Sequence, residues 1–147
     1  IGIIFLFEEK FFRNNKLKIE DLKLNQVLVI GLSQAIAFIR GVSRSGITLI
    51  FGQLAGLKRV DAAEFSFLIS IPILIGTSIF SLVEFISLPR EQLSEELLPA
   101  LVGMVIAFIT GLLAVKFLLS FLKNNSLKLF GVYRIALGLI LLGVIFI

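Results

Sequence analysis

The chain has 147 residues, of which 58% are hydrophobic and 16% charged, whereas roughly a quarter of the residues in a soluble domain are charged. It contains no cysteine and no histidine, so disulfides, thiolate metal sites and histidine acid–base chemistry are excluded within it. The formal net charge of +4 is typical of basic cytoplasmic loops in a membrane protein, and we expect no nucleic-acid partner. Continuous apolar runs of about 18 residues or more predict an all-α integral membrane protein.

The chain begins with a short apolar segment and a basic loop. Residues 1–7, IGIIFLF, are too few to cross a membrane and are expected to be the end of a transmembrane helix. Residues 8–25 are polar and predict a basic loop, in which Glu8 and Glu9 would be solvated. Because neither an initiator Met nor a signal segment precedes Ile1, we expect this chain to be the C-terminal part of a longer protein.

Two short apolar segments, 26–39 and 47–57, flank the polar stretch 40–46, RGVSRSG. The first would form a helix of roughly 21 Å, which is short of the hydrocarbon thickness of about 30 Å. Two such helices joined by a polar loop predict a re-entrant hairpin over residues 26–57. Non-helical backbone at membrane depth is tolerated only where protein or water satisfies it, so the loop is expected to line a cavity.

Three further apolar segments predict transmembrane helices over 60–87, 97–122 and 129–147. Pro72 removes one helical hydrogen bond from the first of these and predicts a kink beside it. The segment 88–96 is expected to be a polar loop. The prediction is therefore a re-entrant hairpin with about three to four transmembrane helices.

The loop charges predict how these helices cross the membrane. The segments 8–25, 58–59 and 123–128 are basic, whereas 88–96 contains three glutamates and one arginine. Basic loops stay in the cytoplasm, so the hairpin would enter and leave on that side. The last three helices would then cross the membrane outward, inward and outward, in a multi-pass protein of the plasma membrane.

The polar loop has the chemistry of a phosphate-binding site. Ser45 is expected to be the N-cap of a helix that begins near Gly46, with free N–H groups facing the loop. Arg44 adds a permanent charge and a planar fork suited to phosphate oxygens. Charged groups at membrane depth are costly and are usually functional. The small and hydroxyl side chains around this arginine are Gly41, Ser43, Ser45, Gly46 and Thr48.

These residues resemble a known family. The stretch GVSRSGIT is similar to the P-G-x-S-R-S-G-x-T loop of the bacterial undecaprenyl-diphosphate phosphatases, the bacitracin-resistance type. The resemblance continues through EFSFL and the following Pro72 to FGVYRIALGLILL, and it covers residues 26–147. One departure is Arg40, which stands where the family pattern has proline. This second arginine would either add phosphate affinity or, as we expect, extend toward the membrane surface.

The resemblance implies an enzyme that converts undecaprenyl diphosphate to undecaprenyl phosphate, recycles the carrier lipid for peptidoglycan synthesis and confers bacitracin resistance. It also implies two inverted halves, each with a re-entrant hairpin, of which this chain would be the second. The first half would supply a glutamate motif and a histidine, so this chain alone is expected to be inactive. Its partners would be the isoprenyl diphosphate, membrane lipids, the first half and a second copy in a homodimer. No metal ligand is expected in this chain, although the resemblance implies that a divalent cation, Mg²⁺ or Ca²⁺, assists.

The resemblance assigns the main site roles to the loop. Arg44 would clamp the diphosphate and stabilise charge in the transition state. Ser43 and Ser45 would bind phosphate oxygens, or one of them would be a nucleophile, for which this half offers no visible base. The remaining phosphate-binding residues would be Gly41, Gly46 and Thr48.

Three residues outside the loop are candidates for a supporting role. Gln34 takes a place that resembles the first glutamate position of the other repeat. Glu64 follows Asp61 by three, so the pair would form a capping box or Glu64 would assist catalysis. Arg134 would extend toward the membrane surface, pair with Glu64 or contact the loop.

Two other functions fit the same loop. A transporter or lipid flippase would bind an anion in the re-entrant hairpin without hydrolysis. A non-catalytic half-size homodimer would use the hairpin in an unfused repeat. The missing first half would discriminate between hydrolysis and transport. Carboxylates and a histidine in it that face Arg44 would favour hydrolysis, and their absence would favour transport.

Overall fold

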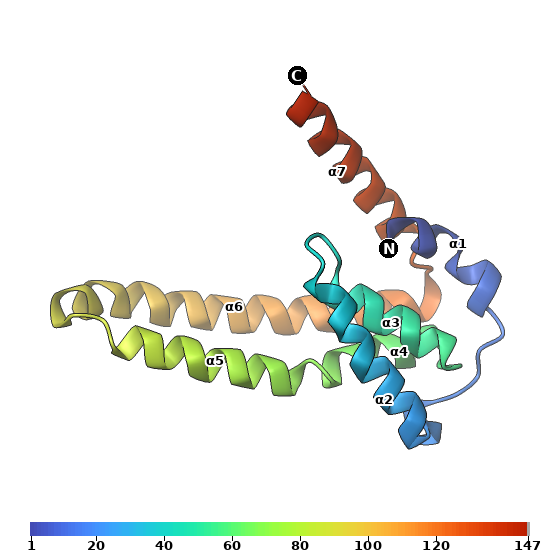
Figure 1. Cartoon of the computed structure of the whole chain (residues 1–147), viewed down its shortest axis with the longest axis horizontal. Helices are drawn as coiled ribbons and strands as arrows, with labels where there is room; N and C mark the ends of the chain where they lie inside the picture. Colours follow the sequence, from blue (N-terminus) through green and yellow to red (C-terminus); the bar gives the residue numbers. More distant parts are fainter. Residues whose placement is uncertain (147) are drawn as a thin grey trace.

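The structure is a computed structural model that describes residues 1–146, and within them the regular structure is helical (Figure 1). The only β pairing among these residues is an isolated parallel bridge between Leu17 and Leu57. The elements in chain order are α1 Gly2–Phe12, η1 Ile19–Asp21, α2 Leu24–Ser33, η2 Gln34–Phe38, α3 Arg44–Leu54, α4 Arg59–Leu68, α5 Ile71–Ile86, α6 Arg90–Asn124 and α7 Lys128–Phe146.

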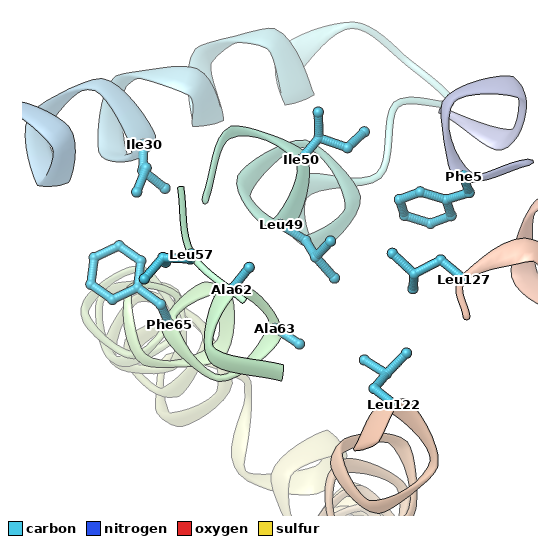
Figure 2. Close-up of a cluster of buried hydrophobic side chains, with 10 residues drawn as sticks. All are labelled: Phe5, Ile30, Leu49, Ile50, Leu57, Ala62, Ala63, Phe65, Leu122 and Leu127. Atoms are coloured by element: carbon cyan, nitrogen blue, oxygen red, sulfur yellow. The ribbon is translucent and has the colours of Figure 1, made fainter. Parts of the chain in front are cut away.

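The core lies where α3 and α4 pack together beneath α2 and beside the α6–α7 connection (Figure 2). Gly52 allows α3 to approach α4 closely, because a Cβ atom on it would lie 3.1 Å from the Cβ of Ala62. Ile30 and Leu57 are fully buried. The buried apolar residues of this core are Phe5, Ile30, Leu49, Ile50, Leu57, Ala62, Ala63, Phe65, Leu122 and Leu127.

Two helical stretches are long and apolar enough to cross a membrane. Arg59–Ile86 has 28 residues and Arg90–Asn124 has 35. The α5–α6 hairpin extends away from the core, and its apolar side chains are exposed (Figure 1). Exposed apolar surface of this extent is typical of helices that contact lipid or further protein.

Several helix boundaries differ from those that hydropathy predicts. The first helix runs on to Phe12, five residues into the predicted basic loop 8–25, which also contains η1 and the start of α2. The predicted loop 88–96 is helical from Arg90 onward, because charged residues are good helix formers in the first turns of a long helix. Of the last predicted helix, residue 147 lies outside the described residues.

Two further predicted segments take a different form. The predicted helix 60–87 is two helices, α4 and α5, which are separated at Ile69 and Ser70, just before Pro72. The segment 26–57 folds as α2, η2 and α3 with a turn between η2 and α3. It is thus a helical hairpin, whose first arm tightens into a 3₁₀ helix before the turn.

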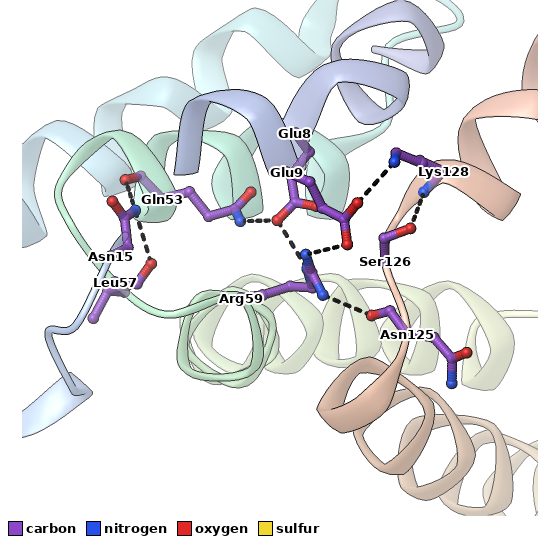
Figure 3. Close-up of polar contacts among 9 residues, drawn as sticks. All are labelled: Glu8, Glu9, Asn15, Gln53, Leu57, Arg59, Asn125, Ser126 and Lys128. Carbon is purple, nitrogen blue, oxygen red and sulfur yellow. Dashed lines mark hydrogen bonds and ion pairs between the residues drawn. The ribbon is translucent and has the colours of Figure 1, made fainter. Parts of the chain in front are cut away.

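Glu8 is buried, so the prediction that it is solvated was wrong. Its side chain is 2% exposed, and its Oε1 accepts a hydrogen bond from Arg59 Nε at 2.8 Å and another from Gln53 Nε2 (Figure 3). Hydropathy placed this residue in a loop, but α1 continues through it and turns it toward α3 and α4. Because a buried carboxylate is costly unless it is paired, this contact joins three helices.

We predict that Glu8→Ala destabilises the full-length protein by about 3 kcal/mol, the lower end for removing one partner of a buried pair, since Arg59 keeps some exposure. The matched control is Glu9→Ala. The Glu9 carboxylate is half-exposed, so its removal should change the free energy of unfolding little. Thermal unfolding in detergent measures both. Equal unfolding midpoints for the two variants would contradict the assignment of Glu8 as the anchor.

Candidate active site

The loop between η2 and α3 begins with a tight turn. The N–H of Val42 donates to the carbonyl of Ile39 at 3.1 Å, and Gly41 has φ +85°. A positive φ at the third position of such a turn is typical of a type II turn and favours glycine there. Arg40 occupies the second position, where proline is favoured in this turn. The family proline and Arg40 are therefore compatible with the same backbone.

Ser43, and not Ser45, is the N-cap of α3. Its Oγ accepts a hydrogen bond from the N–H of Gly46 at 3.1 Å, and α3 begins at Arg44. The prediction that Ser45 caps this helix was wrong, because the chain enters the helix two residues earlier. Gly46 permits the cap, since a Cβ atom there would lie 3.2 Å from both Cβ and Oγ of Ser43.

The start of α3 presents unpaired donors. The N–H groups of Arg44 and Ser45 have no hydrogen-bond acceptor within residues 1–146. The Ser45 hydroxyl is exposed and lies 3.3 Å from the Ser43 Oγ. Arg44 is half-exposed and forms no ion pair with any described residue. Free N–H groups, a hydroxyl and a guanidinium at a helix N-terminus favour an anion.

Thr48 is buried beneath this turn. Its Oγ1 donates to the carbonyl of Arg44 at 3.0 Å or that of Ser45 at 3.2 Å and also contacts the hydroxyl of Ser66. Ser66, on α4, donates in turn to the Ser45 carbonyl at 3.2 Å. Sequence reasoning missed Ser66, although it lies within the EFSFL run. These contacts hold the first turn of α3 against α4.

A cavity of about 320 Å³ opens beside the capped turn. Ser43, Ser45 and Gly46 lie at one part of its wall, together with Arg134 from α7. Other parts are apolar and come from Leu49, Phe67, Leu118 and Phe130. A neighbouring cavity of about 290 Å³ joins Gly41 to the same Arg134. Of the supporting candidates, the structure therefore brings Arg134 to the loop.

Two glycines place Arg134 there. A Cβ atom on Gly131 of α7 would lie 2.8 Å from the carbonyl oxygen of Gly2 of α1. A Cβ atom on Gly2 would in turn lie 3.3 Å from the carbonyl oxygen of Gly131. The helices α1 and α7 thus cross with their backbones in contact, and α7 carries Arg134 past the loop.

The other two supporting candidates do not reach the loop cavities. Gln34 donates to the carbonyl of Gly31 at 3.3 Å, and its Oε1 is buried without a partner among the described residues. Glu64 is exposed on α4. The capping box of Asp61 and Glu64 was a wrong prediction, because α4 begins at Arg59 and Asp61 lies within its first turn. An acidic side chain there still stabilises the helix N-terminus.

Comparison with known proteins places this geometry in a family. Residues 1–140 match the model of the family described as bacitracin resistance protein BacA. The chain belongs to this family. The loop, its capped helix and Arg134 all lie within the matched residues.

Relatives named undecaprenyl-diphosphatase match nearly the whole chain. The protein from Enterococcus faecalis strain V583 is 39% identical over 145 residues, which are 97% of this chain and 52% of the relative. Those from Aquifex aeolicus and Methanococcus aeolicus are 42% and 38% identical, over 95% and 96% of this chain and 54% and 55% of the relatives. The chain thus spans about half the length of the curated relatives it matches.

The described residues 1–146 do not by themselves offer a set of ligands that fits a divalent cation. Within residues 1–146 no group of three or more carboxylate, histidine or cysteine side chains comes together. The loop cavity is lined by hydroxyls and an arginine, which do not provide the carboxylate oxygens that Mg²⁺ and Ca²⁺ prefer. A cation near this loop would need ligands from outside these residues.

We predict that Ser43→Ala lowers the stability of the full-length protein by about 1 kcal/mol, because the Gly46 N–H loses its cap. Ser45→Ala is the matched control and should leave the thermal unfolding midpoint unchanged, since its hydroxyl caps nothing. A larger loss in Ser45→Ala than in Ser43→Ala would reverse the assignment of the cap.

We also predict that Arg40→Pro stabilises the protein by about 0.4–1 kcal/mol, because proline lowers the conformational entropy of the unfolded chain. Ile39 is already extended, with ψ 121°, as a residue before proline must be. The backbone N–H of Arg40 donates to no acceptor among the described residues, so no hydrogen bond is lost. Chemical unfolding would measure the gain, and a destabilised variant would contradict the turn assignment.

Proposed function

We propose that the protein to which this chain belongs removes the terminal phosphate of undecaprenyl diphosphate. The observation that carries this proposal is the loop cavity, in which hydroxyls and a cation lie beside apolar walls. A lipid diphosphate likewise combines a charged head with an apolar chain. Its relatives' shared name, undecaprenyl-diphosphatase, supports the same substrate.

The start of α3 would bind the diphosphate. The free N–H groups of Arg44 and Ser45 would donate to its oxygens, and the half-exposed guanidinium of Arg44 would neutralise charge. Arg134 would approach from the other side of the loop. Such fixed donors stabilise a phosphoryl-transfer transition state without rearranging during the reaction. Thr48 would act indirectly, by holding this turn, since its hydroxyl is already bonded.

The two serines would have separate tasks. Ser43 is committed to the cap, whereas the exposed Ser45 hydroxyl is available to donate to a phosphate oxygen. In the reaction, the bond between the terminal phosphorus and the bridging oxygen breaks, and water supplies the new oxygen of the released phosphate. A base must take the proton of that water, and the loop offers none. We assign that base to the half of the protein outside this chain.

The apolar wall would hold the first part of the isoprenyl chain. Leu49, Phe67 and Leu118 come from α3, α4 and α6 and line the cavity that Ser45 also lines. Burial of the apolar lipid surface, which contributes about 25 cal/mol per Å², would hold the lipid while the head reacts. The site would thereby recognise the lipid chain near the diphosphate.

The wider setting follows from the same proposal. The hairpin of α2, η2 and α3 would re-enter the plasma membrane, and this half would meet an inverted first half across the loop. The product, undecaprenyl phosphate, would return to peptidoglycan synthesis, and its supply would confer bacitracin resistance. No observation favours transport without hydrolysis.

The proposal predicts that Arg44→Ala lowers the turnover of undecaprenyl diphosphate by the full-length protein about a thousandfold or more, as expected for an arginine that stabilises phosphoryl transfer. Phosphate release measures the rate. Arg40→Gln is the matched control. Neither arginine lines a loop cavity, but Arg44 is the first residue of α3, whereas Arg40 is exposed and lies in the turn before it. Near-normal turnover in Arg44→Ala would refute the role of Arg44. Binding of the lipid without phosphate release by the wild-type protein would favour transport instead.

A further inference from the structure

A second cavity, a crevice of about 1140 Å³, lies at the far end of α3 from the loop. It opens where α1 ends, α4 begins and α6 connects to α7, around the polar network of Figure 3. Its charged lining comprises Glu8, Glu9, Lys10, Arg13, Lys58, Arg59, Asp61, Lys123 and Lys128. Six of these are basic and three acidic, which leaves a formal excess of three positive charges.

Two of the three carboxylates are already engaged. Glu8 is bonded to Arg59, and Glu9 Oε2 lies 2.8 Å from the Nζ of Lys128. The hydrogen bond from Lys128, with the nearby charge of Arg59, holds the pKa of Glu9 below its usual value. Glu9 is thus already paired with a cation of the crevice.

Among the described residues, four cations of the crevice are unpaired, and with the one free carboxylate, Asp61, they leave the excess of three positive charges. Lys10, Arg13, Lys58 and Lys123 are exposed, and none forms an ion pair with any residue in the described range 1–146. They come from α1, the segment after it, the start of α4 and the end of α6. An excess of positive charge around one crevice is repulsive, and an anion bound between these cations would relieve that repulsion.

The crevice lies at the polar ends of both helical stretches that are long enough to cross a membrane. One of these stretches begins at Arg59 and the other ends at Asn124. Lys58 and Lys123 therefore lie where lipid headgroups would be. Phe117, an exposed apolar side chain, lies on the second of these stretches, where acyl chains would run.

We propose that this crevice binds the phosphate headgroup of an anionic phospholipid at the cytoplasmic surface of the membrane. Basic pockets between the cytoplasmic ends of membrane helices are typical headgroup sites. The site is separate from the substrate loop, because Gln53 beside Glu8 lies nine residues, or about 14 Å, along α3 from Arg44. The proposal does not depend on the catalytic function.

The test compares lipid binding by three forms of the full-length protein in nanodiscs of phosphatidylglycerol and phosphatidylcholine. The first form is wild type, and the second carries Arg13→Gln, Lys58→Gln and Lys123→Gln. The third, a matched control, carries Lys16→Gln, Lys18→Gln and Lys23→Gln, which are exposed and lie outside the crevice. Native mass spectrometry counts the phosphatidylglycerol molecules that each protein retains.

We expect the crevice variant to bind phosphatidylglycerol about a hundredfold more weakly, because each Lys or Arg at the membrane surface contributes roughly a factor of five. The control should bind as the wild type does. A charge-conserving variant with Arg13→Lys, Lys58→Arg and Lys123→Arg should also retain binding, which separates lost charge from misfolding.

Three outcomes would overturn the proposal. Unchanged binding by the crevice variant would show that these cations hold no lipid. An equal loss in the control would show that general surface charge attracts the lipid. Displacement of phosphatidylglycerol by an equal concentration of inorganic phosphate would show a site for a small anion instead of a lipid.

Discussion

The position of α3 decides most of what this chain can do, and buried polar contacts fix both of its ends. At its start, Thr48 and Ser66 join the first turn to α4. At its end, Gln53 donates to Glu8, which also binds Arg59. Such groups are costly to bury unpaired, so each contact permits little displacement. The free donors at the start of α3 are therefore held in a fixed place.

The turn before α3 resolves a conflict that a membrane imposes. A continuous helix would satisfy its backbone but would offer no N–H groups to a ligand. The turn at Gly41 ends the first arm, and Ser43 then satisfies one N–H of the new helix and leaves those of Arg44 and Ser45 free. The two free N–H groups at the start of α3 are thus available to an anion.

The apolar surfaces of this chain are also informative. The α5–α6 hairpin is exposed along both helices, whereas the core is confined to α3, α4 and their neighbours (Figures 1 and 2). Because the chain spans about half the length of its curated relatives, some of this surface is available to contacts beyond these residues.

The sequence by itself determined the helical class, the family and the loop that carries the free donors. Long apolar runs and the spacing in GVSRSGIT are local features, and local features can be recognised without knowledge of the fold. The residues of the loop were identified this way, although the cap was assigned to Ser45 instead of Ser43, because caps depend on backbone angles that spacing does not fix. The path of the first helix was also missed, since hydropathy counts a charged residue such as Glu8 as loop.

Only the tertiary structure decided which distant residues meet. Arg134 reaches the loop because Gly2 and Gly131 let α1 and α7 touch, and Glu64 does not reach it because α4 directs it outward. Glu8 became an anchor only when α3 and α4 supplied Gln53 and Arg59. The sequence around a single charged residue such as Glu8 does not indicate which residue it pairs with. Its burial and its pairing are set by packing between segments that lie up to 51 residues apart along the chain.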